Sequence, residues 1–191
     1  VLRRQFEVPS DTIIGNGAGN FATWAHRYWR YGGLRSQLAP TAGSMGYGVP
    51  AGIAAKLVAP ERTVLTFAGD GDFLMTAQEL ATAAMYQAGV LILVFNNGMY
   101  GTIRMHQERH HPARVIGTEL LNPRFDLLAQ SYGGFGTVVD SSGQFAPALQ
   151  EALAFIRARR LPAVIELRTD AQVITPGTTL AAIRASALAG R

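Results

Sequence analysis

The side chains best suited to chemistry in this chain stand at the ends of two apolar segments. Asp70 lies between two glycines after the segment 63–68, and Asn97 follows the segment 90–95. Both segments are typical of buried parallel strands, and a crossover helix is predicted between them over 73–87. Because a right-handed crossover returns the chain in parallel, we expect Asp70 and Asn97 at the same carboxyl edge of one sheet.

These two side chains offer the oxygen donors that a hard cation prefers. The Asp70 carboxylate and the Asn97 amide oxygen could share Mg²⁺, with the remaining positions filled by phosphate, a backbone carbonyl and water. Gly69 and Gly71 would let the backbone approach that phosphate closely. Taken singly, Asp70 could cap a helix and Asn97 could belong to a turn. Their combination with the flanking sequence favours a metal site.

Strands and helices alternate along the rest of the chain. The pattern predicts further strands over 12–14, 135–139 and 163–167, and helices over 21–31, 46–58, 100–109, 124–132 and 145–159. Asn122 and Pro123 are expected to cap and open the helix that follows them. This alternation is typical of an α/β fold, a doubly wound parallel sheet with helices on both faces. We interpret 1–11 as a linker or arm, 12–170 as the binding domain and 171–191 as a tail with one further helix.

The composition indicates one domain with more apolar surface than a free-standing monomer would expose. The chain has 191 residues, of which 48% are hydrophobic and 16% charged, so we expect another domain or subunit to cover part of it. It lacks a starting Met and a signal-peptide core, and we interpret it as a fragment of a longer protein. Its lack of Cys excludes disulfides and thiol chemistry and fits a cytoplasmic enzyme.

The charge pattern indicates neither a nucleic-acid nor a membrane partner. The net charge is +4, and the arginine cluster at 157–160 has no interleaved aromatic residues, so it is interpreted as a solvated face. Apolar segments fall short of the ~20 residues that span a bilayer. The expected partners are therefore a small-molecule substrate and other protein domains.

A glycine-rich loop at 15–20 is reminiscent of a dinucleotide-binding fingerprint. Asn20 stands where the pattern requires its third glycine, and the chain has no acidic residue between Asp11 and Glu61. A ribose-binding acid is needed about 20 residues after the loop. The sequence therefore argues against nicotinamide binding, although the loop is well placed to cradle a phosphate.

A histidine cluster invites comparison with a zinc site. His106 and His110 are four residues apart, as on one helix face, but a third ligand would have to come from Glu108 or His111. Those two residues point elsewhere on a helix, so zinc is disfavoured.

Three motifs in order resemble the thiamine diphosphate-dependent enzymes, in the branch of acetolactate synthases and 2-oxo acid decarboxylases. They are the Gly-Asp-Gly at 69–71, the segment Asn-Asn-Gly-Met-Tyr-Gly at 96–101 and the segment Gly-Ser-Met-Gly-Tyr-Gly-Val-Pro-Ala at 43–51. The resemblance extends from about Asp11 to Asp170 and implies the thiamine diphosphate-binding fold.

The resemblance implies a role for each matched position. Asp70, Asn97 and the backbone carbonyl of Met99 would hold Mg²⁺. The residues that would face the diphosphate are Gly19, Asn20, Gly71, Asp72, Tyr100 and Gly101. Met45 would wedge beneath the cofactor and fold it, and the Gly43 carbonyl would accept a hydrogen bond from its aminopyrimidine. Met45 could also be ordinary core filling.

The substrate pocket departs from the family pattern. Ile103 and His106 match positions that line the pocket in acetolactate synthases, where Trp is common at the position of His106. Those enzymes also tend to carry Gln and His where this chain has Asn20 and Phe21. A hydrogen-bonding or proton-shuttling role for His106 is a hypothesis.

The implied function is the cofactor-binding part of an enzyme that decarboxylates a 2-oxo acid and either protonates the product or ligates it to a second carbonyl. In relatives, an activating glutamate comes from a separate pyrimidine-binding domain, usually in a neighbouring subunit. We therefore expect this fragment alone to be inactive and the full-length protein to be a homodimer or homotetramer. The alternatives are an oxalyl-coenzyme A or benzoylformate-type decarboxylase, and a catalytically retired relative that keeps the fold as an interaction or regulatory module.

Overall fold

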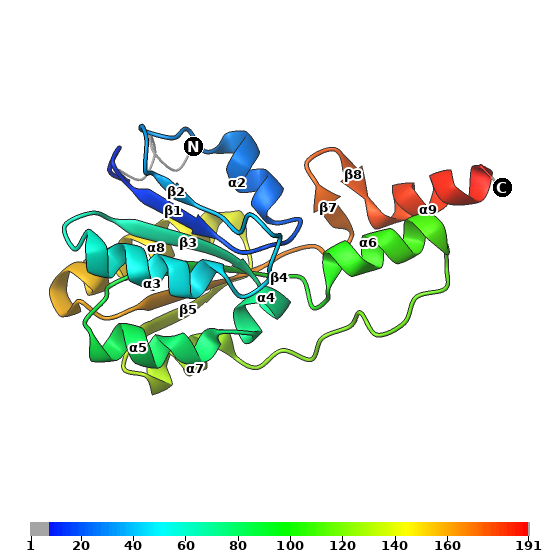
Figure 1. The fold of residues 1–191 in the computed structure, drawn as a ribbon. Helices are drawn as coiled ribbons and strands as arrows, with labels where there is room; N and C mark the ends of the chain where they lie inside the picture. The colour runs from blue at the N-terminus through cyan, green and yellow to red at the C-terminus, as the bar shows by residue number, and fades with distance from the viewer. Residues whose placement is uncertain (1–7, 191) are drawn as a thin grey trace.

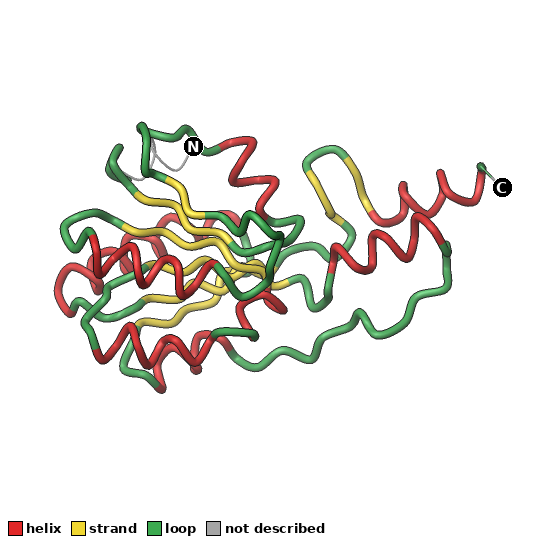
Figure 2. The backbone as a smooth tube through the Cα atoms, viewed as in Figure 1, coloured by secondary structure: helices red, strands yellow, loops and turns green. Residues whose placement is uncertain are grey.

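A six-stranded parallel sheet forms the centre of the molecule (Figures 1 and 2). The computed structural model describes residues 8–190, so most of the predicted arm at 1–11 lies outside the described residues. The strand order is β2-β1-β3-β4-β6-β5. The strands are β1 (Ile13–Asn16), β2 (Gln37–Leu38), β3 (Val64–Gly69), β4 (Leu91–Asn96), β5 (Phe135–Val139) and β6 (Ala163–Arg168).

Helices cover both faces of this sheet, as the sequence predicts for a doubly wound fold. The helices of one face are α3 (Gly48–Val58), α4 (Asp70–Leu74), α5 (Leu80–Met85) and α7 (Phe125–Ser131), with the 3-10 turn η1 (Ala77–Glu79). The helices of the other face are α2 (Ala22–Tyr28) and α8 (Ser142–Arg159). The strands alternate between the two apolar layers: in β4, Ile92 and Val94 face one layer and Leu91 and Leu93 the other.

The strand order creates a crevice at the carboxyl edge. From β1 the chain crosses to β2 on one side, whereas from β3 it crosses to β4 on the other. The loops after β1 and β3 therefore leave the sheet in opposite directions. Ligands of open parallel sheets bind at such a switch point.

The predicted helix over 73–87 is wrong, because the chain forms α4, η1 and α5 there instead. The break falls at Thr76, which has φ −139° and donates from its hydroxyl to the Gly46 carbonyl at 2.9 Å. Gly46 has φ +79°, and a Cβ on it would lie 3.1 Å from Met75 and from Thr76. The break in the helix therefore lets Thr76 contact the turn that follows Met45. This tertiary contact overrides the helical periodicity of the sequence.

Other elements differ from the sequence-based prediction in smaller ways. The short strand β2 lies in a segment that carries no predicted element, and α8 begins at Ser142, where Ser141 and Gln144 form a capping box. Asn122 does not cap α7, whose N-cap residue is Arg124. The tail contains a two-stranded hairpin, β7 (Val173–Thr175) and β8 (Thr178–Thr179), before the predicted helix α9 (Leu180–Ala189).

The hairpin and α9 lie beyond the carboxyl edge of the sheet, beside α6 (Gly101–His110) (Figure 1). A long loop, 111–124, returns from α6 to α7. No helix within residues 8–190 has the length and apolar character needed to span a bilayer.

Gly48 provides a test of the packing that shapes this edge. A Cβ on Gly48 would lie 2.7 Å from the Gly17 nitrogen and 3.0 Å from the Asn16 carbonyl carbon, backbone atoms at the end of β1 and the start of its loop. We expect Gly48→Ala to lower the free energy of unfolding by about 1–3 kcal/mol, because the backbone cannot make room. Denaturant unfolding measures the change.

Gly143→Ala is the matched control in another helix. Gly143 lies in α8, and a Cβ on it would have no atom within 4 Å, so alanine there should stabilise by up to about 1 kcal/mol through helix propensity. Equal effects of the two substitutions would contradict the close approach at Gly48.

Candidate functional site

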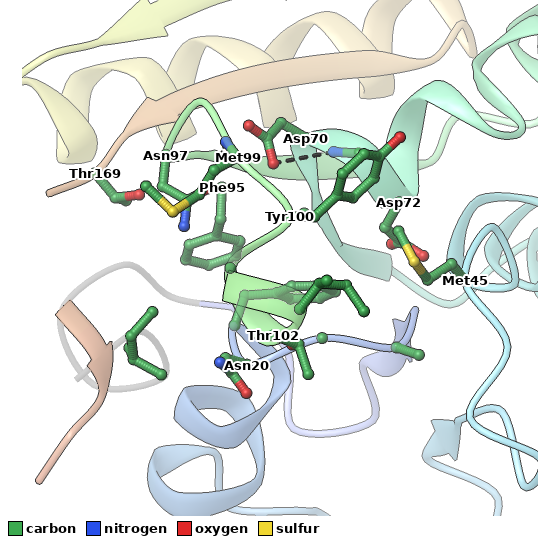
Figure 3. Close-up of a pocket in the computed structure, with 18 of the residues that line it drawn as sticks. Asn20, Met45, Asp70, Asp72, Phe95, Asn97, Met99, Tyr100, Thr102 and Thr169 are labelled. Atoms are coloured by element: carbon green, nitrogen blue, oxygen red, sulfur yellow. Dashed lines mark hydrogen bonds between the residues drawn. The ribbon is translucent and has the colours of Figure 1, made fainter. Parts of the chain in front are cut away.

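A cavity of about 740 Å³ opens at the carboxyl edge, between the loops that follow β1, β3 and β4 (Figure 3). This volume is within the usual range for small-molecule sites. Asp170 and the tail residues Val173 and Ile174 close one side of it. The residues expected from the sequence that line the cavity are Gly19, Asn20, Gly43, Met45, Asp70, Gly71, Asp72, Asn97, Met99, Tyr100, Gly101 and Ile103.

The register of the central strands brings the two expected metal ligands to one edge. Gly69 pairs with Phe95, so β3 and β4 end level with each other. Asp70 and Asn97 follow these residues and line the same cavity, in agreement with the crossover argument. The Asn97 Oδ1 accepts a hydrogen bond from the Met99 amide at 3.2 Å, which closes a tight turn around the position of the expected carbonyl ligand.

Asp70 is a buried carboxylate held by three donors. Its Oδ1 accepts from the Gly71 amide at 2.9 Å, and its Oδ2 accepts from the Gly98 amide at 2.9 Å and from Asn122 Nδ2 at 2.8 Å. Burial raises the pKa of Asp70 above its ordinary value, and these three hydrogen bonds oppose the rise. A cation beside the carboxylate would favour the ionised form.

Asp72 braces the loops around the cavity. Its Oδ1 accepts from the Gly46 amide at 2.6 Å, one residue after Met45, and a Cβ on Gly17 would lie 2.0 Å from its Oδ2. Burial raises the pKa of Asp72 to about 6, although the amides of Gly46, Gly69 and Ala18 donate to it. The Asp72 carboxylate thus ties the Met45 turn to the turn that carries Asp70.

Two glycines allow aromatic rings to approach the backbone closely. A Cβ on Gly71 would lie 2.5 Å from the Tyr100 ring, and one on Gly19 would lie 2.6 Å from the Phe21 ring. Phe21 stacks on Phe95 with ring centroids 5.9 Å apart and an interplanar angle of 16°. The cavity therefore has an apolar aromatic wall on the side of β1 and β4 and a polar wall at Asp70 and Asn97.

His106 does not join the other expected site residues. Ile103 lines the cavity, but His106 is exposed on α6 and stacks on His110, with ring centroids 6.2 Å apart and an interplanar angle of 4°. Among residues 8–190 no group of three or more His, Cys, Asp or Glu side chains is arranged to hold a metal ion. The described cavity gives no support to a substrate contact by His106.

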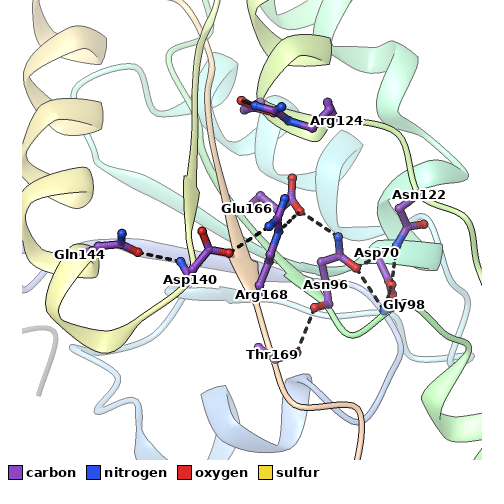
Figure 4. A network of polar contacts seen from close by, with 11 residues as sticks. Asp70, Asn96, Gly98, Asn122, Arg124, Asp140, Gln144, Glu166, Arg168 and Thr169 are labelled. Atoms are coloured by element: carbon purple, nitrogen blue, oxygen red, sulfur yellow. Dashed lines mark hydrogen bonds and ion pairs between the residues drawn. The ribbon is translucent and has the colours of Figure 1, made fainter.

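Asn122 and Glu166 do not line the cavity, but they belong to a polar network that reaches Asp70, and the sequence singles out neither as a site residue (Figure 4). Asn122 donates to Asp70, and Glu166 accepts from Asn96 Nδ2 at 2.9 Å. Asn122 precedes a proline, a pattern that is typical of a helix cap. Glu166 did carry a signal, because it is a charged residue inside an otherwise apolar predicted strand.

An ion pair between the buried Glu108 and the partly exposed Arg184 links the tail that closes the cavity to α6. The Glu108 side chain on α6 is fully buried and accepts from Arg184 of α9, with Nε to Oε2 at 2.8 Å and a second bond from Nη2 to Oε1. Arg104 Nε at 3.3 Å and the Ala113 amide at 3.0 Å donate to the same carboxylate. The Arg184 hydrogen bond is the main cause that lowers the pKa of Glu108 to about 2, against the effect of burial.

This ion pair gives the protein an acid-dependent stability. Because the pKa of Glu108 is about 2 in the folded state and 4.5 ordinarily, its contribution is complete above pH 4.5 and is lost as the pH falls toward 2. We expect Glu108→Gln to lower the free energy of unfolding at pH 7 by about 1–3 kcal/mol. The difference between wild type and variant should shrink as the pH falls from 4.5 to about 3.

Glu151→Gln, at an exposed position on α8, is the control and should differ little from wild type at any pH. Urea unfolding at several pH values measures both variants. A Glu108→Gln difference that stays constant from neutral to strongly acidic pH would contradict the lowered pKa.

Comparison with known proteins places the chain in a family. The family model described as "Thiamine pyrophosphate enzyme, C-terminal TPP binding domain" matches residues 17–167. The chain is 31% identical over 170 residues to a sulfoacetaldehyde acetyltransferase of Alcaligenes xylosoxydans xylosoxydans, covering 88% of this chain and 28% of that protein. It is 37% identical over 125 residues to the acetolactate synthase large subunit of Lactococcus lactis, covering 64% of this chain and 22% of that protein.

A solved structure supports the same family assignment. The thiamine diphosphate-dependent 4-hydroxybenzoylformate decarboxylase of Rhodococcus jostii RHA1 superposes with a TM-score of 0.76 at 31% identity, over 88% of this chain and 31% of that one. The chain therefore belongs to the thiamine pyrophosphate enzymes and has the fold of their C-terminal cofactor-binding domain. It spans less than a third of the length of these relatives.

Proposed function

We propose that this chain is the diphosphate- and magnesium-binding domain of a thiamine diphosphate-dependent enzyme that decarboxylates a 2-oxo acid. The observation that carries the proposal is that Asp70 and Asn97 line one cavity together with several glycines, and that this cavity lies at the switch point of the sheet. Family membership supports the cofactor. The metal and the reaction are inferred from the donor set and from the relatives.

The oxygen donors of the site fit Mg²⁺. The expected ligands are one carboxylate, one amide oxygen and one backbone carbonyl, from Asp70, Asn97 and Met99. Mg²⁺ typically uses one or two protein carboxylates and takes its other ligands from phosphate and water. The Asp70 Oδ1 accepts only the Gly71 amide among the described hydrogen bonds, so it retains a lone pair for a cation.

The other residues of the cavity would bind and orient the cofactor. Gly71, Tyr100 and Gly101 lie beside the metal ligands, where a diphosphate would sit, and Gly19 and Asn20 face them from the β1 loop. Met45 and Gly43 line the cavity on the turn that Asp72 braces, and they would support the organic rings. When bound, thiamine diphosphate supplies the electron sink for loss of carbon dioxide. Phe21 and Phe95 would keep water from that part of the site.

Two of these relatives favour 2-oxo acid chemistry, with two alternative outcomes. An acetolactate synthase and a 4-hydroxybenzoylformate decarboxylase are both similar to this chain. The structural neighbour gives specific support to an aromatic 2-oxo acid decarboxylase as the second candidate, beside a carboligase. Screening pyruvate and benzoylformate for carbon dioxide release, with and without an acceptor carbonyl, separates the two candidates.

Asp70→Ala tests the cofactor site directly. In the full-length protein we expect calorimetry to show thiamine diphosphate binding that requires Mg²⁺, and a loss of at least about 100-fold in affinity in the variant, because the carboxylate ligand is gone. Asp11→Ala removes an exposed carboxylate far from the cavity and should bind as wild type does. Magnesium-independent binding that survives Asp70→Ala would overturn the assignment.

Because the chain spans less than a third of the length of these relatives, we expect the active enzyme to need further domains. We propose that a pyrimidine-binding domain, contributed by a second subunit, completes the site. Purified residues 1–191 should release no measurable carbon dioxide from pyruvate in the presence of the cofactor and Mg²⁺, whereas the full-length protein should turn over its 2-oxo acid. Turnover by the 191-residue chain alone would contradict this proposal.

A further inference from the structure

The Asn122 side chain bridges two residues of the site from a distant segment. Its Nδ2 donates to Asp70 Oδ2 at 2.8 Å and to Asn96 Oδ1 at 2.8 Å, so both of its N–H bonds are used (Figure 4). The amide keeps this orientation although its own Oδ1 is buried without a hydrogen-bond partner among residues 8–190. Reversing the amide would set its oxygen against two other oxygens.

The orientation of the neighbouring amide is fixed as well. Asn96 Nδ2 donates to Glu166 Oε1 at 2.9 Å, and Glu166 is 2% exposed. A carboxylate accepts but does not donate when ionised. The Asn96 Oδ1 must therefore face the other way, where it accepts from Asn122 and from the Gly98 amide at 3.1 Å. A chain of polar contacts thus runs from Glu166 through Asn96 and Asn122 to Asp70.

Backbone pairing brings Asn122 to this position. The Leu120 amide donates to the Gly98 carbonyl at 2.8 Å, and the Tyr100 amide donates to the Thr118 carbonyl at 2.8 Å. The segment 118–122 therefore lies along the turn that carries Asn97 and Met99. Movement of this segment would remove the Asn122 donor from Asp70 and from Asn96, whose Oδ1 also accepts from the Gly98 amide.

We propose that Asn122 is a positioning residue that determines how Asp70 binds its metal. Oδ2 of Asp70 accepts two hydrogen bonds, from Asn122 and Gly98, whereas Oδ1 accepts one. Because two hydrogen bonds occupy Oδ2 and hold the carboxylate in place, Oδ1 would be the oxygen that Asp70 offers to a cation. This inference rests on the proposed function, because it takes Asp70 as the magnesium ligand.

The test titrates Mg²⁺ into the full-length protein at a saturating concentration of thiamine diphosphate, with calorimetry as the readout. Asn122→Ala removes both donors, and we expect the Mg²⁺ concentration for half-saturation to rise about 10–100-fold. Saturating Mg²⁺ should restore thiamine diphosphate binding, since the direct ligands remain. A general loss of structure would instead weaken cofactor binding at every Mg²⁺ concentration and lower the thermal midpoint of the metal-free protein.

Two further variants separate hydrogen bonding from packing. Asn122→Leu keeps a similar shape without donors, and it should weaken Mg²⁺ binding as Asn122→Ala does. Gln150→Ala truncates an exposed amide on α8, outside the cavity, and should bind as wild type does. If Asn122→Leu or Asn122→Ala bound Mg²⁺ as wild type does, the proposed role of Asn122 would be wrong and the proposed function would stand. Absence of magnesium-dependent cofactor binding in the wild-type protein would overturn the proposed function together with this role.

Discussion

Strands β3 and β4 end at the same level of the sheet, and the site depends on this constraint. Their parallel register pairs Gly69 with Phe95, and the hydrogen bond from the Gly98 amide to Asp70 at 2.9 Å joins the two turns that follow. A slip of one residue would turn every side chain of a strand to the other face. Because β3 and β4 are buried on both sides, such a slip would require the closely packed side chains of both apolar layers to repack. The core therefore specifies the position of the polar edge.

Buried carboxylates set the electrostatic character of that edge. Asp70, Asp72 and Glu166 are each no more than 3% exposed. Burying an ionised carboxylate is costly unless donors compensate it. Backbone amides and two asparagines supply donors, yet burial still raises the pKa values of Asp70 and Asp72. The neutral donors therefore do not offset the burial of Asp70 and Asp72, and a cation bound beside them would favour their ionised forms.

The sequence predicted the parts of this structure that depend on local pattern or on strand order. The parallel sheet is confirmed, and the expected meeting of Asp70 and Asn97 agrees with the cavity. The break at Thr76 and the role of Asn122 could not be predicted, because each depends on a contact with a residue far away in the chain. His106 shows the opposite case: its helix was predicted correctly, but helical spacing did not reveal that the residue lies outside the cavity.

The tail illustrates how stability outside the site can govern its shape. Val173 and Ile174 line the cavity, but the hairpin that carries them has only two short strands. Such a hairpin is marginal by itself. Its position depends on α9, which the buried Glu108 fastens to α6 through Arg184. The same helix α6 begins at Gly101, next to the turn of Asn97 and Met99. The ion pair between Glu108 and Arg184 therefore links the tail side of the cavity to the helix that follows the turn of Asn97 and Met99.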